Sequence, residues 1–476
     1  MPKLLVFIPT YNECDNVELI CNDILALGIE LDILFLDDNS PDGTGQLLDD
    51  LAMKHSNVQV IHRTGKLGIG SAHLEGIRHA YSSGYEFLIT MDCDFTHMPS
   101  DILPMLQASE GYDITIGSRY LQNASLEGWS IFRKSLTLFA HFLTKTLLKL
   151  DCDASGAFRI YNLKRIPLAA FELIAAKSYS FFFESLFILI NNGATVKEIP
   201  IVLTPRTYGH SKMTFGEAFR SARFLLRLSI ENLVNPGRFR MGRKINSINY
   251  DLQDPQNWDP YWKRKRETTI FIYEVIAAVY RQLIIKTNLK RELAKYFSEG
   301  AVNLLHAGCG GGQVDMDLHT QFRISAVDIS LEALNLYSRN NPHAYHIDHG
   351  SILHLPYPDS FFDGAYNQGV FEHFTHNDIN QILREFHRVL KPGGKIVIFW
   401  PHRHGSSVIV LKILHFLLNK VLKKDIYFHP PEISLICGKS EATQILENAN
   451  FSLLNYAFSA RDFYIQATVV GVKNGD

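Results

Sequence analysis

Residues 85–101 read Tyr85-Glu-Phe-Leu-Ile-Thr-Met-Asp92-Cys-Asp94-Phe-Thr-His-Met-Pro-Ser-Asp101, an apolar run that leads into two carboxylates one residue apart. We expect residues 85–91 to form a buried strand that ends at Asp92 and Asp94. Side chains alternate along a strand, so acids two positions apart point to the same side. Hard cations such as Mg²⁺ and Mn²⁺ bind carboxylate and phosphate oxygens. The pattern indicates a metal site for a diphosphate; a solvated turn is the alternative interpretation of so short a motif.

The segments before this stretch repeat a strand, a turn and a helix. Apolar runs at residues 4–8, 31–36 and 58–61 are each followed by a polar turn and an amphipathic segment. This order is typical of an α/β fold, in which ligands bind at the carboxyl ends of the strands. The polar residues expected at those ends are Glu13, Asp38, Lys66, Asp92 and Asp94. Their convergence predicts a nucleotide site.

Length and composition limit the number of domains and the classes of protein that the sequence can represent. The chain has 476 residues, enough for two or three domains, and a net charge of −2 that argues against a dedicated nucleic-acid binder. The six cysteines contain no Cys-x-x-Cys pair, which predicts a reducing compartment and neither a disulfide framework nor a zinc site.

Seven segments in order resemble known glycosyltransferase motifs. They are Ile8-Pro-Thr-Tyr-Asn-Glu13, Leu36-Asp-Asp-Asn-Ser-Pro-Asp-Gly-Thr44, the loop 63–70, Asp92-Cys-Asp-Phe-Thr-His97, Gly117-Ser-Arg-Tyr120, Ser155-Gly-Ala-Phe-Arg159 and Arg206-Thr-Tyr-Gly-His-Ser-Lys212. Over residues 1–235 the chain resembles the GT-A family 2 glycosyltransferases, and within them the dolichol- or polyprenyl-phosphate mannosyltransferases. One position departs from that family, because Thr96 stands where a glutamine is usual.

The resemblance implies a donor, an acceptor and a metal. The donor would be a nucleotide-diphosphate sugar, with GDP-mannose expected, and the acceptor a polyprenyl phosphate. The metal, Mg²⁺ or Mn²⁺, would lie on Asp92 and Asp94 and offset the charge of the leaving diphosphate. An acceptor phosphate is already ionised, so a single inverting displacement needs no general base. The residues expected to bind the nucleotide sugar are Pro9, Tyr11, Glu13, Asp38, Lys66, Arg119 and Arg133.

Four cations are candidates for the phosphates: Arg119, Arg133, Arg206 and Lys212. Arginine pairs with phosphate in a planar fork, whereas the alternative for any single cation is plain solvation at the surface. Arg206 and Lys212, together with Asp92 and Asp94, form the predicted catalytic set. Glu184, in the run Phe181-Phe-Phe-Glu184, is interpreted as structural.

Two segments combine aromatic and basic residues at helical spacing, residues 129–150 and 215–234. Such helices can lie in the bilayer interface beside a lipid acceptor, or they can pack on the sheet. The N-terminus lacks the features of a signal peptide, and no run of about 18 apolar residues occurs. We therefore predict a cytoplasmic protein that is peripheral at the membrane face, without a transmembrane span.

A second α/β domain is expected over residues 261–476, after a polar linker at 236–260. An apolar run at 302–306 precedes Gly308-Cys-Gly310-Gly-Gly312, and Asp328 closes the next strand, at the distance from which a carboxylate reaches ribose hydroxyls. These features alone fit both a dinucleotide fold and an S-adenosylmethionine fold.

Later motifs decide between the two. Residues 347–363, Phe371-Glu-His-Phe374 and residues 385–398 resemble class I S-adenosylmethionine-dependent methyltransferases over residues 260–470. The resemblance implies that Gly308 and Gly310 approach the amino-acid end of the cofactor, Asp328 binds the ribose, and Asp348, with Ser351 or Ile352, flanks the adenine. His306 replaces the acid that usually opens the first motif. His373 is a candidate base, although Glu-His pairs at this place often lack that role.

The fold class expected is therefore α/β, with an N-terminal GT-A (Rossmann-like) glycosyltransferase domain and a C-terminal class I methyltransferase domain that is also Rossmann-like. The chain is interpreted as a bifunctional enzyme that transfers a sugar to a polyprenyl phosphate and a methyl group to an acceptor of the same glycolipid or polysaccharide pathway. Two alternatives remain: a soluble or glycan acceptor for the sugar, and a degenerate second domain that serves as a binding module.

Overall fold

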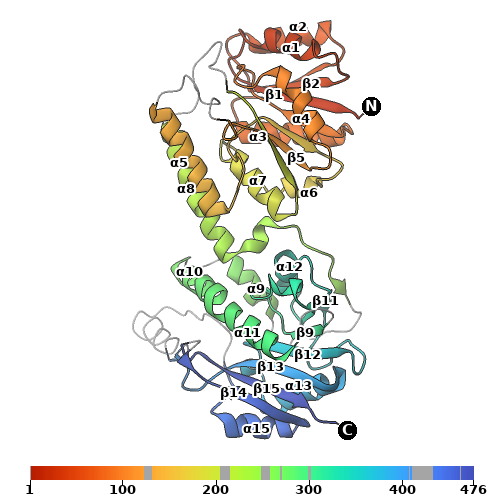
Figure 1. The fold of residues 1–476 in the computed structure, drawn as a ribbon, viewed down its shortest axis with the longest axis vertical. Helices are drawn as coiled ribbons and strands as arrows, with labels where there is room; N and C mark the ends of the chain where they lie inside the picture. Colours follow the sequence, from red (N-terminus) through yellow and green to blue (C-terminus); the bar gives the residue numbers. More distant parts are fainter. Residues whose placement is uncertain are drawn as a thin grey trace. The chain divides into compact units, whose positions relative to one another are not determined.

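The computed structural model describes residues 2–122, 131–203, 215–247, 258–267, 271–297, 302–406, 408–409, 432–460 and 463–475. Within these ranges only the backbone is described for residues 131–133, 215, 247, 263–267, 271–274 and 276. The chain divides into two compact units (Figure 1). The first comprises Met1–Asn232 and Arg238–Met241, and the second Leu233–Gly237 and Gly242–Asp476.

The first unit contains a seven-stranded sheet in the order β3-β2-β1-β4-β6-β5-β7. The strands are β1 (Leu4–Thr10), β2 (Asp32–Asp37), β3 (Val58–His62), β4 (Phe87–Thr90), β5 (Ile114–Ser118), β6 (Arg159–Asn162) and β7 (Val196–Pro200). Neighbouring strands are parallel, except that β6 is antiparallel to both β4 and β5.

Helices cover this sheet, and their apolar residues recur at the spacing of a helix face. In α1, for example, Val17, Ile20, Cys21 and Ile24 are buried. The helices of the first unit are α1 (Val17–Leu25), α2 (Thr44–Lys54), α3 (Ile69–Ser82), η1 (Pro99–Asp101), α4 (Ile102–Ala108), α5 (Ile131–Leu148), α6 (Leu168–Phe171), α7 (Phe181–Asn191), α8 (Phe215–Val234) and η3 (Pro236–Phe239).

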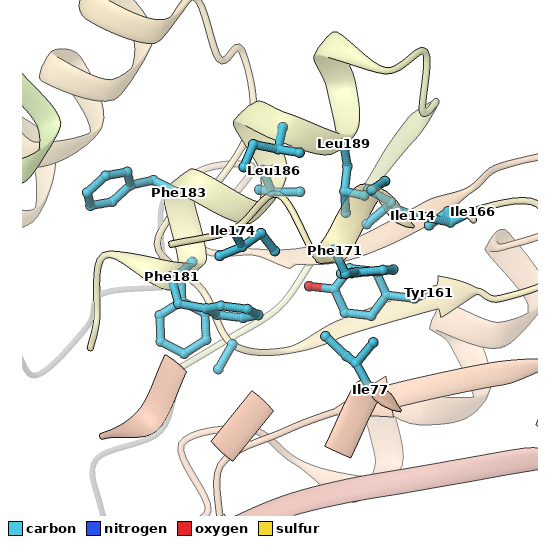
Figure 2. Close-up of a cluster of buried hydrophobic side chains, with 14 of the residues drawn as sticks. Ile77, Ile114, Tyr161, Ile166, Phe171, Ile174, Phe181, Phe183, Leu186 and Leu189 are labelled. Carbon is cyan, nitrogen blue, oxygen red and sulfur yellow. The ribbon is translucent and has the colours of Figure 1, made fainter. Parts of the chain in front are cut away.

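Strand β1 lies between two hydrophobic clusters. Its residues Leu5 and Phe7 belong to one cluster, whereas Val6 and Ile8 belong to the other. Alternate side chains of a strand point to opposite faces, so β1 is buried on both faces of the sheet, as is usual for parallel strands. Figure 2 shows part of the first cluster, which includes Leu186 and Leu189 of α7, Ile77 of α3, Ile114 of β5 and Tyr161 of β6.

Helices α5 and α8 run side by side (Figure 1), and the Ser229 hydroxyl donates a hydrogen bond to the Leu147 carbonyl. Their buried faces, which include Leu225 and Leu228, join the first cluster. Other apolar side chains of the two helices are exposed: Leu136, Leu138, Phe139, Phe142, Phe219 and Leu226. The helices therefore pack on the domain and also present an apolar surface.

The second unit contains an eight-stranded sheet in the order β14-β15-β13-β12-β9-β10-β11-β8. The strands are β8 (Asn246–Ser247), β9 (Asn303–Ala307), β10 (Arg323–Asp328), β11 (His346–His349), β12 (Phe362–Gln368), β13 (Leu390–Pro401), β14 (Phe451–Ala457) and β15 (Gln466–Lys473). Pairing is parallel from β8 to β13, and β15 is antiparallel to β13 and β14. The α/β fold class predicted for both halves is confirmed.

Capping residues explain where two helices of this unit begin. The hydroxyl of Ser330 accepts from the Ala333 N–H at the start of α12, and Thr375 forms a capping box with Asp378 at the start of α13. The helices are α9 (Trp258–Glu267), α10 (Phe271–Tyr280), the π-helix η4 (Arg281–Ile285), α11 (Lys286–Tyr296), η5 (Leu318–Thr320), α12 (Leu331–Asn340), η6 (Phe371–His373), α13 (His376–Val389) and α15 (Lys439–Glu447).

The region expected to be a linker, residues 236–260, contains ordered elements. Phe239 is buried, with its ring 5.2 Å from that of Phe187 in the first unit. Asn246 and Ser247 form β8, which pairs with β11 in the second sheet. Polar composition gave no sign of this strand, because its pairing depends on a partner about 100 residues away. In the part of the chain that the structure describes, no helix is long and apolar enough to cross a membrane.

Candidate functional site

The carboxyl ends of β3, β2, β1 and β4 lie at one edge of the first sheet, because these neighbouring strands are parallel. In the register, Asp37 lies opposite both Thr10 and His62. The predicted nucleotide-binding residues are in or directly after these strand ends, so they gather at this edge. They are Pro9, Tyr11, Glu13, Asp38, Lys66, Asp92 and Asp94.

The loop after β1 is tied to the loop after β2. The backbone N–H groups of Asn12 and Glu13 donate to the hydroxyls of Ser40 and Thr44, both at 3.0 Å. Asn12 has a φ of 55°, a left-handed conformation that asparagine tolerates well. The Glu13 carboxylate accepts from the Asn16 amide at 2.7 Å. These bonds fix the backbone that carries Tyr11 and Glu13.

Two consecutive acids at the end of β2 have different partners. Asp37 accepts hydrogen bonds from the backbone N–H and the hydroxyl of Ser40, which orders the turn. Asp38 accepts instead from Arg63 Nη1 at 2.7 Å, and Arg63 Nη2 donates to the Ser71 hydroxyl. Burial raises the pKa of Asp38, although the Arg63 guanidinium acts in the opposite direction. The sequence motif included Arg63, but this role was not predicted.

Tyr11 and Lys66, which follow different strands, are in contact. The Lys66 ammonium nitrogen lies 4.1 Å from the centre of the Tyr11 ring, within the range of a cation–π interaction. The structure therefore brings together two residues predicted to bind the same ligand.

The Asp92–Asp94 turn is held by its own neighbours. The Asp92 N–H donates to Nδ1 of the buried His97 at 3.1 Å, so in the neutral ring the proton is on Nε2. Burial lowers the pKa of His97, although the carboxylates of Asp92 and Asp94 act to raise it. The N–H and hydroxyl of Thr96 both donate to Asp94 Oδ1, at 3.2 and 2.6 Å. Thr96 thus orients Asp94.

The donor types at this turn fit a divalent cation of the Mg²⁺ or Mn²⁺ class, which prefers oxygen ligands. The side chain of Asp92 is 34% exposed, whereas Asp94 is buried. Across the described ranges, no group of three histidine, cysteine or acidic side chains is placed to hold a metal. Asp92 and Asp94 thus supply carboxylate oxygens of the type that such a cation binds.

Arg119 forms a buried ion pair with Asp153. Its Nε lies 2.8 Å from Asp153 Oδ2, and the Asp153 side chain is fully buried. The backbone N–H groups of Ser155 and Gly156 also donate to Asp153. Burial acts to lower the pKa of Arg119, but the carboxylates of Asp153 and, less strongly, Asp92 raise it above its ordinary value. Arg119 therefore combines a structural pair with a position near the acidic turn.

Three predicted phosphate ligands lie outside the described residues: Arg206, Lys212 and the side chain of Arg133. Glu184 is fully buried, and its Oε2 accepts from the N–H groups of Ala175 and Ala176 at 3.1 and 2.7 Å. These bonds fix the chain before α7, which agrees with the structural interpretation. Burial raises the pKa of Glu184.

In the second unit, the glycine-rich loop follows β9 and meets the end of β10. Gly308 and Gly310 have φ values of 70° and 52°, which favour glycine. A Cβ at Gly308 would lie 2.9 Å from a methyl group of Val370, so only a glycine fits there. The buried Asp328 accepts hydrogen bonds from the N–H groups of Gly310 and Ser330. The loop and Asp328 thus form the kind of cradle that a nucleoside cofactor requires.

Asp348, which was expected beside an adenine, is held by two side chains. Its Oδ1 accepts from the Asn246 amide at 3.0 Å, and its Oδ2 from the Tyr357 hydroxyl at 2.7 Å. Ile352, one of the two alternatives with Ser351 for the position beside it, is buried in the apolar cluster of this unit. Asp348 therefore also connects β11 to the short strand β8.

His306, in place of the usual acid, has a carboxylate as partner. Its Nδ1 lies 2.6 Å from Asp315 Oδ2, which also accepts from the Tyr337 hydroxyl. The ring of Tyr366 stacks on His306 at 4.4 Å. Burial acts to raise the pKa of Asp315, but His306 and the Tyr337 hydroxyl keep it below its ordinary value. A buried carboxylate is thus present beneath the loop, supplied by a residue that the motif did not reveal.

Glu372 and His373 follow β12 in η6. Glu372 is 4% exposed, and its Oε2 has no hydrogen-bond partner among the residues that the structure describes. Burial raises the pKa of Glu372 to about 8, and the Glu432 carboxylate acts in the same direction. Its Oε1 lies 3.9 Å from His373 Nε2, too far for a hydrogen bond. At neutral pH the Glu372 side chain is therefore mainly protonated.

Comparison with known proteins gives two family matches. Residues 5–165 match the family model Glycosyl transferase family 2, and residues 305–398 match the model Methyltransferase domain. The chain is 38% identical over 228 residues to polyprenol monophosphomannose synthase of Mycolicibacterium smegmatis, a match that covers 47% of this chain and 84% of that protein. It is 33% identical over 215 residues to undecaprenyl-phosphate mannosyltransferase of Micrococcus luteus, a match that covers 45% of this chain and 88% of that protein.

Among solved structures, the chain is similar to magnesium protoporphyrin IX methyltransferase of Synechocystis, with a TM-score of 0.35 and 13% sequence identity. The match covers 46% of this chain and 96% of that protein's chain. The assignment of the second half depends on the family model. The predicted resemblance of both halves is confirmed, and the chain combines glycosyltransferase and methyltransferase domains.

The Arg119–Asp153 pair predicts a large stability effect. The substitution Arg119→Met leaves the fully buried Asp153 carboxylate without its cation, so the free energy of unfolding should fall by about 3 kcal/mol. This is the lower end of the range for buried ion pairs, because three backbone N–H groups still donate to Asp153. Urea denaturation followed by circular dichroism measures the change. Lys164→Met, which breaks an exposed pair with Glu86, should cost less than about 1 kcal/mol. Equal effects of the two substitutions would contradict the prediction.

Glu372 predicts a pH dependence of stability. Its pKa is about 8 in the folded chain and about 4.3 in an unfolded one. Between these values the unfolded state has lost a proton that the folded state keeps, so stability falls by about 1.4 kcal/mol per pH unit and levels off above pH 8. Glu372→Gln should remove this fall and stabilise the second unit above pH 5.

Tryptophan fluorescence during urea denaturation is a suitable readout, because Trp258, Trp262 and Trp400, three of the four tryptophans, lie in the second unit. Glu447→Gln, at an exposed position of α15, is the matched control and should leave the pH profile unchanged. Parallel profiles of wild type and Glu372→Gln would show that Glu372 does not titrate in this window.

Proposed function

The chain belongs to glycosyl transferase family 2 through its N-terminal half, and we propose that this half transfers mannose from GDP-mannose to the phosphate of a polyprenyl phosphate. The observation that best supports this proposal is that the acidic turn Asp92–Asp94 lies at the same sheet edge as Tyr11, Asp38 and Lys66. Two relatives support the substrate class, since one is named a polyprenol monophosphomannose synthase and the other an undecaprenyl-phosphate mannosyltransferase.

In the proposed reaction an acceptor phosphate oxygen attacks the anomeric carbon of the sugar. The bond from that carbon to the donor diphosphate breaks, and GDP leaves with the bonding electrons, so the configuration inverts. The attacking oxygen is already ionised at neutral pH, and no general base is required. The barrier is then reduced mainly by alignment of the reactants and by stabilisation of the leaving charge.

We assign the residues by their chemistry. Asp92 and Asp94 would hold a divalent metal, which when bound neutralises diphosphate charge. Thr96 would keep Asp94 oriented through its two hydrogen bonds. The residues proposed for base and ribose are Pro9, Tyr11, Glu13 and Asp38, with Lys66 for the nucleotide sugar. The cations proposed for the phosphates are Arg119, Arg133, Arg206 and Lys212.

For the second half, we propose methyl transfer from S-adenosylmethionine to an intermediate of the same glycolipid or polysaccharide pathway. The cradle formed by Gly308, Gly310 and Asp328 fits the amino-acid and ribose parts of the cofactor. Asp348 is proposed beside the adenine. Fusion of the two domains in one chain is the reason to place both reactions in one pathway.

The proposed acceptor has a lipid tail, and the exposed face of α5 and α8 suits a membrane surface. Apolar side chains on this face alternate with cations, the composition of helices that lie in the bilayer interface. The exposed cations are Lys145, Arg220, Arg223 and Arg227. We propose that this face binds the membrane peripherally and brings the acidic turn to the acceptor phosphate.

Labelled GDP-mannose, Mg²⁺ or Mn²⁺ and a short polyprenyl phosphate test the sugar transfer. The wild-type chain should move label to the organic phase, and Asp94→Asn should reduce the rate by at least about 100-fold, the scale of losing one charge-stabilising group. Glu110→Gln, at an exposed position, should retain the wild-type rate. Donor binding without lipid labelling would exclude a polyprenyl acceptor and favour a soluble or glycan acceptor.

Co-sedimentation with vesicles tests the membrane face. Phe139 and Phe142 are 57% and 59% exposed, and each would contribute about 1.5–3 kcal/mol on full burial in the bilayer. The double substitution Phe139→Ser with Phe142→Ser should weaken binding to vesicles that contain anionic lipid by more than about tenfold. Met53→Ser, on α2 and 78% exposed, should leave binding unchanged. Wild-type binding in the double variant would exclude this face.

A further inference from the structure

Helix α9 contacts the carboxyl ends of three strands in the second unit, although it precedes every motif that was used to identify the domain. Its residue Asp259 accepts hydrogen bonds from the Ser330 hydroxyl and the Glu332 N–H. Ser330 also contacts Asp328 through its backbone N–H. The first turn of α9 is therefore attached to the turn that carries the proposed ribose ligand.

Trp262 of α9 packs on the glycine-rich loop. A Cβ at Gly310 would lie 2.8 Å from Trp262 Cζ2 and 2.9 Å from Cη2, so the ring rests against the glycine α-carbon. These atoms lie on the edge of the six-membered ring. The six-membered ring of the indole therefore contacts the loop at this glycine. A side chain at position 310 would displace the indole.

Trp258 reaches the end of β12. Its ring centre lies 5.0 Å from that of His373, at an interplanar angle of 74°. Tyr261 lies between the two tryptophans in sequence and contacts both, at 5.8 and 5.4 Å. Asp259, Trp262 and Trp258 therefore connect α9 to the ends of β10, β9 and β12 respectively.

We propose that α9 forms one wall of the cofactor site and that the Trp262 ring binds the α-ammonium group at the amino-acid end of S-adenosylmethionine. This inference rests on the methyltransferase function proposed above. The loop at Gly308 and Gly310 is the part of the site assigned to that end of the cofactor, and Trp262 is in contact with it. Tryptophan has the most negative π face among the aromatic side chains and attracts ammonium and sulfonium groups. Asp259 positions the helix, because it connects α9 to the ribose turn.

Two ligands distinguish binding by the Trp262 ring from a role in which the ring only packs against the loop. S-Adenosylhomocysteine keeps the ammonium group of the amino-acid end, whereas 5′-methylthioadenosine keeps the nucleoside and the thioether but lacks that end. In the full chain, Trp262→Leu should raise the Kd of S-adenosylhomocysteine by about 3- to 30-fold, the change in Kd that corresponds to the loss of one cation–π contact. The Kd of 5′-methylthioadenosine should change by less than about twofold. Titration calorimetry measures both constants without any methyl acceptor.

Two further variants serve as controls. Trp262→Phe keeps an aromatic face and should lose less affinity for S-adenosylhomocysteine than Trp262→Leu does. Glu447→Gln changes an exposed position of α15, outside the proposed cofactor site, and should leave both Kd values within about twofold. Thermal unfolding followed by circular dichroism confirms that each variant is folded.

Equal loss of affinity for both ligands in Trp262→Leu would overturn the inference, because it would mean that the indole only supports the loop. Equal effects of the Phe and Leu variants would overturn it as well, since the π face would then have no role. If the wild-type chain binds neither S-adenosylmethionine nor S-adenosylhomocysteine, the proposed methyltransferase function fails and the inference fails with it.

Discussion

Parallel pairing of neighbouring strands is the constraint on which both halves of this protein depend. Parallel strands require crossover connections, and all their carboxyl ends then face the same edge of the sheet. In the first unit this edge brings residues that follow β1, β2, β3 and β4 together, although they are spread over more than 80 positions of the chain. In the second unit the same geometry unites the loop after β9 with Asp328 at the end of β10. The chemistry of each half is therefore set by short loops on a rigid sheet.

Three ionisable groups at these edges have a buried partner of opposite charge type. Arg63 pairs with Asp38, Arg119 with Asp153, and His306 with Asp315. An unpaired buried charge is costly, so each pair keeps a polar group in place at the sheet edge without loss of the fold. Glu372 shows the other solution, since a buried carboxyl without a cation is neutral at ordinary pH. The charges of these residues are therefore largely balanced within the protein itself.

Much of this arrangement was predictable from sequence, because it is encoded locally. Apolar runs predicted the strands that precede Asp38 and Asp92, and the glycine spacing predicted the loop at Gly308. The partners of these residues were not predictable. Asp153 lies 34 positions after Arg119, and Asp315 contacts His306 only through the fold of the loop between them. Such pairs depend on which elements meet in three dimensions, and β8 was missed for the same reason, since its partner is β11.

Strand β8 affects where the second domain can be separated from the rest of the chain. The second sheet takes its outermost strand from residues upstream of its glycine-rich motif, and the Asn246 amide of that strand binds Asp348. An excision that begins at residue 261 would thus expose the backbone of β11 as an unprotected sheet edge, which invites aggregation. The residues Gly242–Ser247, which precede the expected start of the second domain, therefore belong to the second unit and should be kept in any fragment of it.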